Sequence, residues 1–476
     1  MHVTPFLTVS PSFTTLSFWF LLACCYAVYF VVHRQVMLRN IFLLLISYGF
    51  AIVWDWHVPI VLCICTVTSY FLALLLHRTR SVRKKKFILS VSIIGYIGVL
   101  MYCKYMGFFL ENLNVFLRSI GWPSVVWGMS IFLPLGLSFY TFSIISYLTD
   151  VYRGTQQPTK DFLAYALFLA YFAKYIAGPI ERAGHLLPQF QNVQKISMQH
   201  ISTGVMLIVW GLVQKVIIAD NAAVYASYSL LTPGNISANS LTILLALPLQ
   251  IYADFSGYSD IARGIASLFG FTLVKNFNLP YLALSPTDFW RRWHISLSQW
   301  CRDYIYIPLG GNRLGFLFTL RNLFLTMLVV GLWHGASWNF IAWGAYHGIL
   351  SCLYLLAERY ASPDAGYVKF FRIPLVSGMV WFGLVCISWI IFQTYSPEPF
   401  WHVLFLLRPT GGKFFLLTLL CWIPIFSIHA WAQYAKKRTR SASASPLLRM
   451  TFVLACLYVL IFLAPFRQFD FVYKQF

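Results

Sequence analysis

The sequence has few charged residues. Asp, Glu, Lys and Arg make up only 10% of its 476 residues, whereas 59% are apolar. Soluble domains carry roughly a quarter of charged residues, so a soluble chain of this length could not bury so much apolar surface. A lipid bilayer can cover that surface. The composition therefore excludes an ordinary soluble protein and predicts an integral membrane protein.

Acidic residues are especially scarce. The chain has 14 Asp and Glu against 35 Lys and Arg, a formal net charge of +21. In a soluble protein this excess would suggest nucleic-acid binding, but in a membrane protein Lys and Arg gather in cytoplasmic loops. Basic clusters at Arg78–Lys86 and Lys436–Arg440 fit that distribution, and no nucleic-acid-binding module separates them. We expect no nucleic-acid partner.

The ten cysteines lack the spacing of a metal site or a disulfide framework. Most lie inside apolar windows, as Cys24 and Cys25 do, where a thiol behaves as a small hydrophobe. No pair of carboxylates and no cluster of metal ligands stands out along the chain. We expect no metal and no permanently bound cofactor.

The apolar runs are long and continuous, without the period-two alternation of a membrane β-barrel. Each spanning helix needs about 20 mostly apolar residues, and windows of that kind recur from Phe13–Phe30 to Phe452–Phe466. The sequence predicts an all-α polytopic membrane protein with about 11 to 13 transmembrane helices plus re-entrant or interfacial helices. We expect one integral membrane domain over 1–476, comprising N-terminal helices (1–160), a catalytic core (161–350) and C-terminal helices (351–476).

Residues 250–322 break the hydropathy pattern, because they combine many aromatics with many charges and several prolines. Polar backbone of this kind is costly against lipid, so the segment is expected to line an enclosed cavity or to form short helices near the cytoplasmic surface. Guanidinium groups fork onto phosphate oxygens and would suit an anionic donor, although interfacial anchoring is an equal alternative. The arginines in question are Arg291, Arg292, Arg302 and Arg313.

The next apolar window, Leu323–Trp343, has one imidazole, His334, near its middle. An ionisable group inside a membrane helix marks a functional site by default, and the alternative is a histidine hydrogen-bonded between helices. Neutral imidazole is a usable base near pH 7. His334 could therefore take a proton from a hydroxyl that attacks an acyl carbon, with assistance from His294. His347 would point to the other side of an uninterrupted helix, so we do not pair it with His334.

Five blocks of this region resemble a known family. They are Gln250–Asp260, Asn276–Tyr281, Asp288–Ser298, Trp300–Arg313 and the Gly-Leu-Trp-His-Gly-Ala-Ser-Trp block Gly331–Trp338. Two upstream blocks, Pro134–Tyr140 and Ala177–Arg182, fit the same pattern. Together they are similar to the membrane-bound O-acyltransferase family, in particular to its bacterial branch typified by the membrane subunit of alginate O-acetylation. The resemblance covers about residues 40–350.

The resemblance implies a helical core with a funnel to a buried histidine, donor access from the cytoplasm and an acceptor on the far side. The essential intramembrane histidine of the family maps onto His334, and its second characteristic polar residue maps onto His294. Further residues of these blocks are expected to line the core, namely Asp254, Trp333, Trp338 and Asn339.

The implied function is an O-acyltransferase of the bacterial inner membrane that acetylates an extracytoplasmic polysaccharide or cell-wall glycan. A sister branch transfers D-alanine to teichoic acids from a carrier-protein thioester. The segment Ile307–Arg313 looks like the acetylating branch, which favours acetyl-CoA as the donor substrate. Transfer of D-alanine or of another acyl group by the same fold is the alternative enzymatic function. A transporter is the alternative of another class, but no inverted repeat of the kind many transporters have is evident.

No sizeable extracytoplasmic domain is evident, so nothing in the sequence could hold a polymer outside the membrane. We therefore expect a separate periplasmic or extracellular partner that passes the acetyl group to the glycan. The family resemblance implies an SGNH/esterase-like protein with a serine-histidine-aspartate triad. Aromatic segments Tyr395–Trp401 and Phe466–Phe476 are candidate contacts, although an aromatic belt at the interface explains them equally well.

Overall fold

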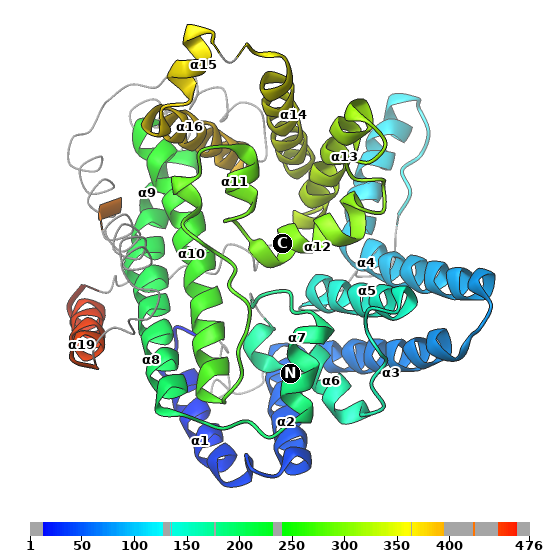
Figure 1. Cartoon of the computed structure of the whole chain (residues 1–476), viewed down its shortest axis with the longest axis vertical. Helices are drawn as coiled ribbons and strands as arrows, with labels where there is room; N and C mark the ends of the chain where they lie inside the picture. Colours follow the sequence, from blue (N-terminus) through cyan, green and yellow to red (C-terminus); the bar gives the residue numbers. More distant parts are fainter. Residues whose placement is uncertain are drawn as a thin grey trace. The chain divides into compact units, whose positions relative to one another are not determined.

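The computed structural model describes residues 13–126, 134, 136–175, 178–231, 240–362, 364–394, 422–423 and 446–463. Regular structure in these residues is helical, with no β-strand among them (Figure 1). The predicted all-α class is confirmed for this part of the chain. The segments Tyr395–Trp401, Lys436–Arg440 and Phe466–Phe476 lie outside the described residues.

Among the described residues, seven helices are long and apolar enough to cross a membrane. In each, the protein itself buries half or less of the most apolar window, and only 17% in the case of Val82–Ser119. Contiguous apolar surface of this extent needs lipid or a partner to cover it. The multi-pass character is thus supported, while the total of about 11 to 13 spans stays a prediction. The seven are Val36–Trp54, His57–Arg78, Val82–Ser119, Met198–Val224, Phe316–His334, Trp338–Tyr360 and Pro374–Gln393.

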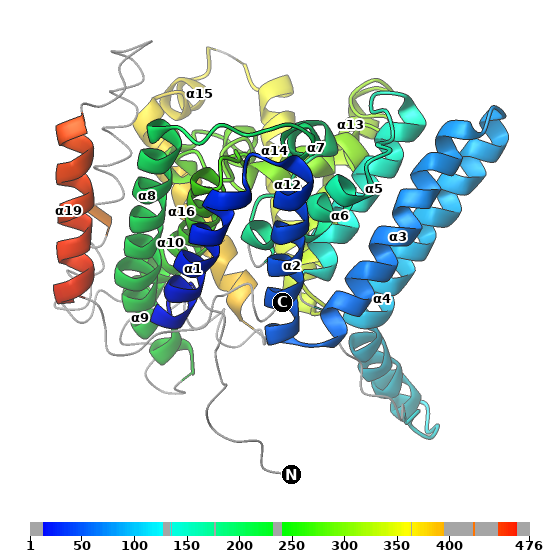
Figure 2. The ribbon, with the colours of Figure 1, turned by 90° about the horizontal axis from the view of Figure 1, so that it is seen from below.

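The chain divides into two compact units, of which the first comprises Met1–Gly204 and Ala262–Val274. Its helices are α1 (Leu16–Val32), α2 (Val36–Trp54), α3 (His57–Arg78), α4 (Val82–Ser119), α5 (Leu137–Arg153), α6 (Phe162–Ala170), the short 3-10 segment η1 (Phe172–Lys174) and α7 (Ala183–Gln191). Helices α3 and α4 lie side by side and meet in a tight turn (Figure 2).

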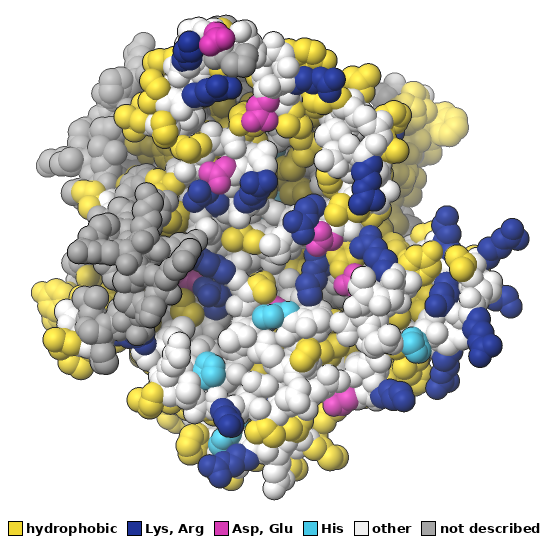
Figure 3. All heavy atoms as spheres, viewed as in Figure 1, with side chains coloured by type: hydrophobic (Ala, Val, Ile, Leu, Met, Phe, Trp, Pro, Cys, Tyr) yellow, Lys and Arg dark blue, Asp and Glu magenta, His cyan; other side chains and the backbone are white. Residues whose placement is uncertain are grey.

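The turn between α3 and α4 carries the basic cluster Arg78–Lys86. Ser81 begins α4, and its hydroxyl accepts a hydrogen bond from the Lys84 amide. The cluster's Lys and Arg side chains are exposed or half-buried. Figure 3 shows Lys and Arg side chains gathered on the right, where Figure 1 labels α3 and α4. Six cations so close together require water or anionic headgroups, so this turn places one end of both helices at an aqueous face.

Buried polar side chains hold the first unit together. The Arg39 side chain on α2 is fully buried, and its guanidinium donates to the Asn192 carbonyl at 2.8 Å and to the Phe190 carbonyl at 2.5 Å. These carbonyls lie at the C-terminal end of α7, where helical carbonyls have no intrahelical partner. One arginine therefore satisfies the end of α7 and joins it to α2.

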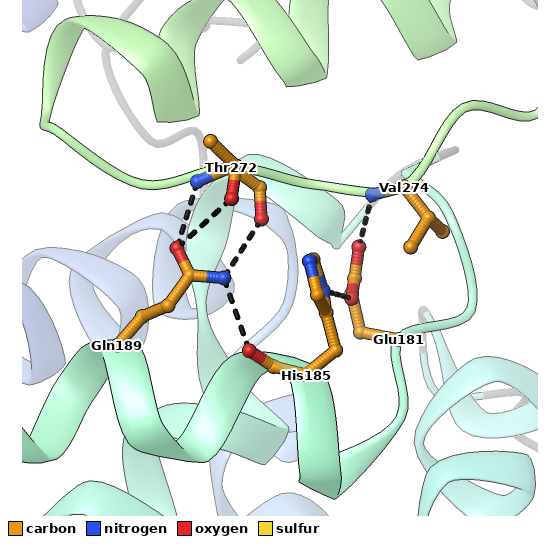
Figure 4. Close-up of polar contacts among 5 residues, drawn as sticks. All are labelled: Glu181, His185, Gln189, Thr272 and Val274. Atoms are coloured by element: carbon orange, nitrogen blue, oxygen red, sulfur yellow. Dashed lines mark hydrogen bonds and ion pairs between the residues drawn. The ribbon is translucent and has the colours of Figure 1, made fainter.

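A second polar network joins α7 to the segment after α10 (Ser240–Leu268), and Figure 4 shows it. The buried Glu181 carboxylate accepts from the Val274 amide and from the His185 ring, both at 2.6 Å. The Gln189 side chain bonds the backbone of Thr272 in both directions, at 2.8 and 3.0 Å. Glu181 belongs to one of the upstream blocks of the resemblance, so this block has a structural role.

The second unit comprises Val205–Ile261 and Lys275–Phe476. Helices α8 (Met198–Leu212) and α10 each have residues in both units, and α8 continues through the π-helical segment η2 (Val213–Ala219) into α9 (Asp220–Leu231). The polar region forms short segments: η4 (Pro280–Leu282), α11 (Pro286–Trp290), α12 (Ile295–Cys301) and η5 (Arg302–Tyr306). Long helices follow: α13 (Phe316–His334), α14 (Trp338–Tyr360), α16 (Pro374–Gln393) after the short α15 (Gly366–Phe371), and α19 (Pro446–Leu463).

The predicted window Leu323–Trp343 is wrong as a single span, because α13 ends at His334 and α14 begins at Trp338. The two helices pack tightly along glycines. A Cβ on Gly344 would lie 2.6 Å from the Met327 carbonyl oxygen, and a Cβ on Gly331 would collide with the Phe340 carbonyl. Small residues that allow close backbone approach are typical of helix pairs in membranes. A hairpin of two helices therefore replaces the expected continuous helix.

We expect Gly344→Ala to destabilise the protein by about 1–3 kcal/mol, because the added methyl would meet backbone that cannot move aside. Gly95→Ala on α4 is the matched control, since nothing lies within 4 Å of its Cβ position. Removing that glycine from a helix should be neutral or stabilising by about 0.5–1 kcal/mol. Thermal unfolding in detergent measures both variants. Equal melting temperatures for Gly344→Ala and the parent would contradict this packing.

The His185–Glu181 pair predicts a pH-dependent contribution to stability. The hydrogen bond to the Glu181 carboxylate raises the pKa of His185 above its ordinary value, against the opposing effect of burial. A raised folded-state pKa means that the stabilisation is fully present below the unfolded value of about 6.5 and is lost as pH rises through the folded pKa. The His185 side chain is 40% exposed, so we expect about 1 kcal/mol or less.

The measurement compares the melting temperatures of the parent and His185→Gln from about pH 5.5 to about pH 8.5. The parent's advantage should be largest at the acidic end and shrink toward the alkaline end. His77→Gln, at an exposed histidine at the end of α3, is the control. An advantage of the parent that grows with pH would show that the imidazolium–carboxylate pair is not its source.

Candidate active site

His334 is the last residue of α13, and its side chain is buried. Aromatic rings surround the imidazole: Trp333 at 4.9 Å, Trp343 of α14 at 5.0 Å and Phe392 of α16 at 5.1 Å between ring centroids. His334 therefore lies at a helix end, and not in the middle of one span as the sequence predicted. Since apolar walls exclude water from a reacting group, this environment suits a base for acyl transfer.

His294 is fully buried and caps α12 from a left-handed backbone conformation, φ 39° and ψ 57°. That conformation is costly for a residue other than glycine and concentrates at functional sites. The Ile295 amide donates to the Asn276 carbonyl at 2.8 Å and fixes the turn. Burial lowers the pKa of His294 to about 3, so its imidazole is neutral at physiological pH. Neither ring nitrogen has a hydrogen-bond partner within the described part of the chain.

Trp333 connects the two histidines predicted to be catalytic. Its ring centroid lies 5.9 Å from that of His294 and 4.9 Å from that of His334. Phe255 of α10 covers the other side of His294 at 4.7 Å. The structure therefore brings the two imidazoles into one aromatic cluster, although forty positions of sequence separate them.

His347 belongs to the same cluster, which the sequence argument did not foresee. The Trp343 ring lies 5.0 Å from His334 and 4.8 Å from His347, so one indole contacts both imidazoles. His347 is fully buried, and neither of its ring nitrogens has a hydrogen-bond partner among the described residues. The sequence argument assumed one uninterrupted helix. Because the chain turns at residues 335–337, His334 and His347 instead lie on different helices.

A buried ion-pair cluster lies in the same unit. The Lys215 ammonium on η2 is 2.7 Å from a carboxylate oxygen of Asp254 on α10 and 2.9 Å from one of Asp220 at the start of α9. All three side chains are at most 2% exposed. Asp254 directly precedes Phe255, which contacts His294. The cluster therefore fixes the helix that positions one wall of the site.

Sequence analysis missed Lys215 and Asp220, although a usable signal was present. Lys215 falls within an apolar stretch, and an ionisable residue there is a functional or structural marker by the same rule that singled out His334. The rule was applied to the histidine alone.

The other residues expected to line the core occupy different positions. Trp333 is 6% exposed, whereas Trp338 is 64% exposed and does not line the core of this unit. The reason is the turn before it, since Trp338 is the first residue of α14 and no longer continues the face of α13. Asn339 is half-buried, and its amide donates to the Phe392 carbonyl at 2.6 Å.

The four arginines lie near the surface of the unit. Arg292 pairs with Asp288 at 2.7 Å, and Arg302 pairs with Asp303 at 2.8 Å. Arg291 and Arg313 are exposed and have no ion pair among the described residues. The Asn322 amide donates to the Gly311 carbonyl at 2.9 Å and ties the loop carrying Arg313 to α13. An anionic ligand would thus find two uncommitted guanidinium groups on the elements that lead to His334.

Comparison with known proteins finds one family model and several relatives that match this chain. The model of the membrane-bound O-acyltransferase family matches residues 41–397. A probable alginate O-acetylase of Pseudomonas aeruginosa is 39% identical over 372 residues, which cover 77% of this chain and 69% of that protein. A peptidoglycan O-acetyltransferase of Helicobacter pylori is 35% identical over 397 residues, covering 77% and 73%. A teichoic acid D-alanyltransferase of Bacillus subtilis is 26% identical over 283 residues, covering 56% and 70%.

The matched segment includes every element that contributes to the histidine cluster, from α10 to α16. The relatives share acyl transfer, although the acyl groups and acceptors in their names differ. The chain is an enzyme that transfers acyl groups, and it belongs to the membrane-bound O-acyltransferase family.

Proposed function

We propose that this enzyme takes an acetyl group from a cytoplasmic thioester and delivers it across the bacterial inner membrane for O-acetylation of an extracytoplasmic glycan. The observation that carries the proposal is the burial of His334 in an aromatic cluster together with His294. The two O-acetylating relatives described above are 39% and 35% identical to this chain, and the D-alanylating relative described above is 26% identical. That difference supports acetyl as the acyl group.

His334 acts as the general base in the proposed reaction. As the acceptor oxygen attacks the thioester carbonyl, its proton passes to the imidazole, and the carbon–sulfur bond breaks. The imidazolium then returns that proton to the leaving thiolate, so the products are an O-acetyl ester and a free thiol. A positioned base of this kind contributes about 100- to 10,000-fold to the rate.

His294 has a different role in this proposal. Its burial keeps the ring neutral, so one ring nitrogen donates a hydrogen bond and the other accepts one. Both nitrogens are without partners in the described structure. A neutral imidazole with that capacity orients the acceptor hydroxyl or the thioester carbonyl toward His334, and its left-handed backbone holds it in place.

Acetyl-CoA is the donor that we propose. Its phosphates would meet Arg291 and Arg313, the two uncommitted guanidinium groups described above, while the thioester extends toward the apolar cluster. The basic turn between α3 and α4 is assigned to the cytoplasmic side because Lys and Arg accumulate there. A carrier-protein thioester is the alternative donor, as expected for D-alanyl transfer.

A separate extracytoplasmic partner completes the proposed pathway. Two acetylating relatives are named for alginate and for peptidoglycan, which are polymers. A histidine enclosed by three helices cannot reach along a polymer, so a soluble carrier must collect the acetyl group. An SGNH/esterase-like protein with a serine nucleophile could accept it as an ester and transfer it to the glycan.

We expect His334→Ala to lower acetyl transfer by at least about 1,000-fold, because it removes the base. His294→Ala should lower it by about 100-fold through loss of orientation. His77→Ala, at the exposed end of α3, is the control and should retain parental activity. Turnover of labelled acetyl-CoA by purified, monodisperse protein is the measurement. Near-parental turnover by well-folded His334→Ala would exclude His334 as the base.

Reconstitution tests the donor and the partner together. Liposomes should expose the α3–α4 turn outward, as checked by trypsin cleavage at its Lys and Arg residues. Labelled acetyl-CoA outside and an oligosaccharide inside should give little sugar acetylation until an SGNH/esterase-like protein is enclosed as well, because the buried site cannot hold the sugar. Arg291→Ala with Arg313→Ala should raise the KM for acetyl-CoA by about 30-fold, since each of the two lost phosphate contacts costs about 1 kcal/mol.

Three results would contradict parts of this proposal. Efficient sugar acetylation by this chain alone would remove the need for a partner. Use of a carrier-protein thioester with no use of acetyl-CoA would favour the D-alanyl alternative. Uptake of a solute or protons without any acyl transfer would favour a transporter.

A further inference from the structure

The first unit contains a cavity that the proposed reaction does not use. Its space amounts to about 300 Å³, part of it continuous with the outside. Gly136 and Tyr140 line it from the start of α5, and Lys174, Tyr175 and Pro179 line it from the segment around η1. These residues come from the two upstream blocks of the family resemblance and the stretch just before the second. Residues that are far apart in sequence thus converge on one cavity inside one unit.

Lys174 is a buried cation at this cavity. Its side chain is 7% exposed, and no carboxylate in the described residues is within ion-pair distance of its ammonium. Its Nζ lies over the Phe168 ring at 4.6 Å. Glu181 is a nearby carboxylate, but its two oxygens already accept from the Val274 amide and from His185. A buried ammonium without a counterion is costly, so this site favours an anion.

Two buried tyrosine hydroxyls at this cavity also lack a hydrogen-bond partner in the described part of the chain. Tyr140 is 3% exposed and Tyr175 is 8% exposed, and neither hydroxyl has a hydrogen-bond partner within the described part of the chain. Buried hydroxyls are usually satisfied by protein, water or ligand. Together with the ammonium, they provide donors for two oxygen atoms of one bound group.

The start of α5 adds a positive partial charge. Gly136 is the N-cap of this 17-residue helix, with φ 74°, and no side chain caps the helix. The first turn has no acidic residue. Helix N-termini attract anions through free amides and the helix dipole. A Cβ on Gly136 would also lie 3.3 Å from the Tyr175 carbonyl oxygen, so glycine keeps the helix start and the Lys174 segment close together.

We propose that this cavity binds an oxyanion group with a single negative charge, held by the Lys174 ammonium and the hydroxyls of Tyr140 and Tyr175 at the start of α5. One ammonium balances one negative charge. Carboxylates and phosphodiesters both present two oxygens with one charge, so a small free carboxylate and the headgroup of an anionic phospholipid share the required chemistry. The residues of this site belong to the first unit, whereas those of the histidine cluster belong to the second.

The test uses the full chain in a neutral detergent, stripped of lipid and transferred to chloride buffer. Melting temperature is followed by tryptophan fluorescence while sodium acetate replaces sodium chloride at constant ionic strength. In a second arm, phosphatidylglycerol replaces phosphatidylcholine in mixed micelles. Binding to the folded state raises the melting temperature, and we expect a rise of about 2–4 °C in at least one arm.

Lys174→Met should abolish that rise, and Lys160→Met is the matched control because Lys160 is an exposed lysine of the same unit. Tyr175→Phe removes one hydroxyl but keeps the ring, so it should raise the half-saturating anion concentration several-fold even where Lys174→Met fails to fold. A response to acetate identifies a free-anion site, and a response to phosphatidylglycerol alone identifies a lipid site. The proposal would be overturned by no response in either arm. It would also be overturned by an equal response in the parent, Lys174→Met and Tyr175→Phe.

Discussion

Lipid offers no hydrogen bonds, so polar groups that this chain carries into the bilayer must be satisfied by the chain itself. The described residues follow that constraint in several places. Arg39 donates to the carbonyls at the end of α7, and Lys215 lies between two carboxylates. Breaking one member of such a buried set leaves an uncompensated charge, which is far more costly than removing an exposed pair. These contacts join α2 to α7 in the first unit, and η2 to α9 and α10 in the second.

The turn after His334 is the local feature on which the site depends. Gly335 has extended backbone, and a Cβ there would collide with the ring of Phe340. The chain can therefore reverse within three residues and return as α14 against α13. This reversal turns the face that carries Trp343 toward His334, so two helices enclose an imidazole that one straight helix would have left on a single face.

The sequence was sufficient to predict the membrane class, and it singled out the block that contains the candidate site. Continuous apolar runs identify spans, and polar residues 250–322 cannot face lipid, so their enclosure follows from composition. His334 could be singled out because an imidazole within an apolar window has a cost that requires a reason. The location of His294 next to Trp333 could not be derived, since it depends on a left-handed backbone conformation that histidine adopts too rarely for the sequence to predict it.

The hairpin was missed for a physical reason. The turn Gly335-Ala336-Ser337 contains small residues and no proline, so average hydropathy passes through it without a change. Trp338 was expected to line the core as part of the same block as His334, whereas it begins a new helix and is exposed. Lys174 was overlooked because one lysine between tyrosines resembles an interfacial residue, and only tertiary packing shows that it is buried without a carboxylate.

The C-terminal helices have a part in the site that the sequence blocks did not indicate. Phe392 of α16 packs its ring on His334, and its carbonyl accepts the Asn339 amide, so a single residue joins α16 to both helices of the hairpin. A thioester next to a base is open to hydrolysis wherever water can enter. A thioester beside a histidine that is covered on only two sides would lose its acyl group to water. The third apolar wall, from α16, limits that loss, and the matched family segment, residues 41–397, includes this helix as well as the hairpin.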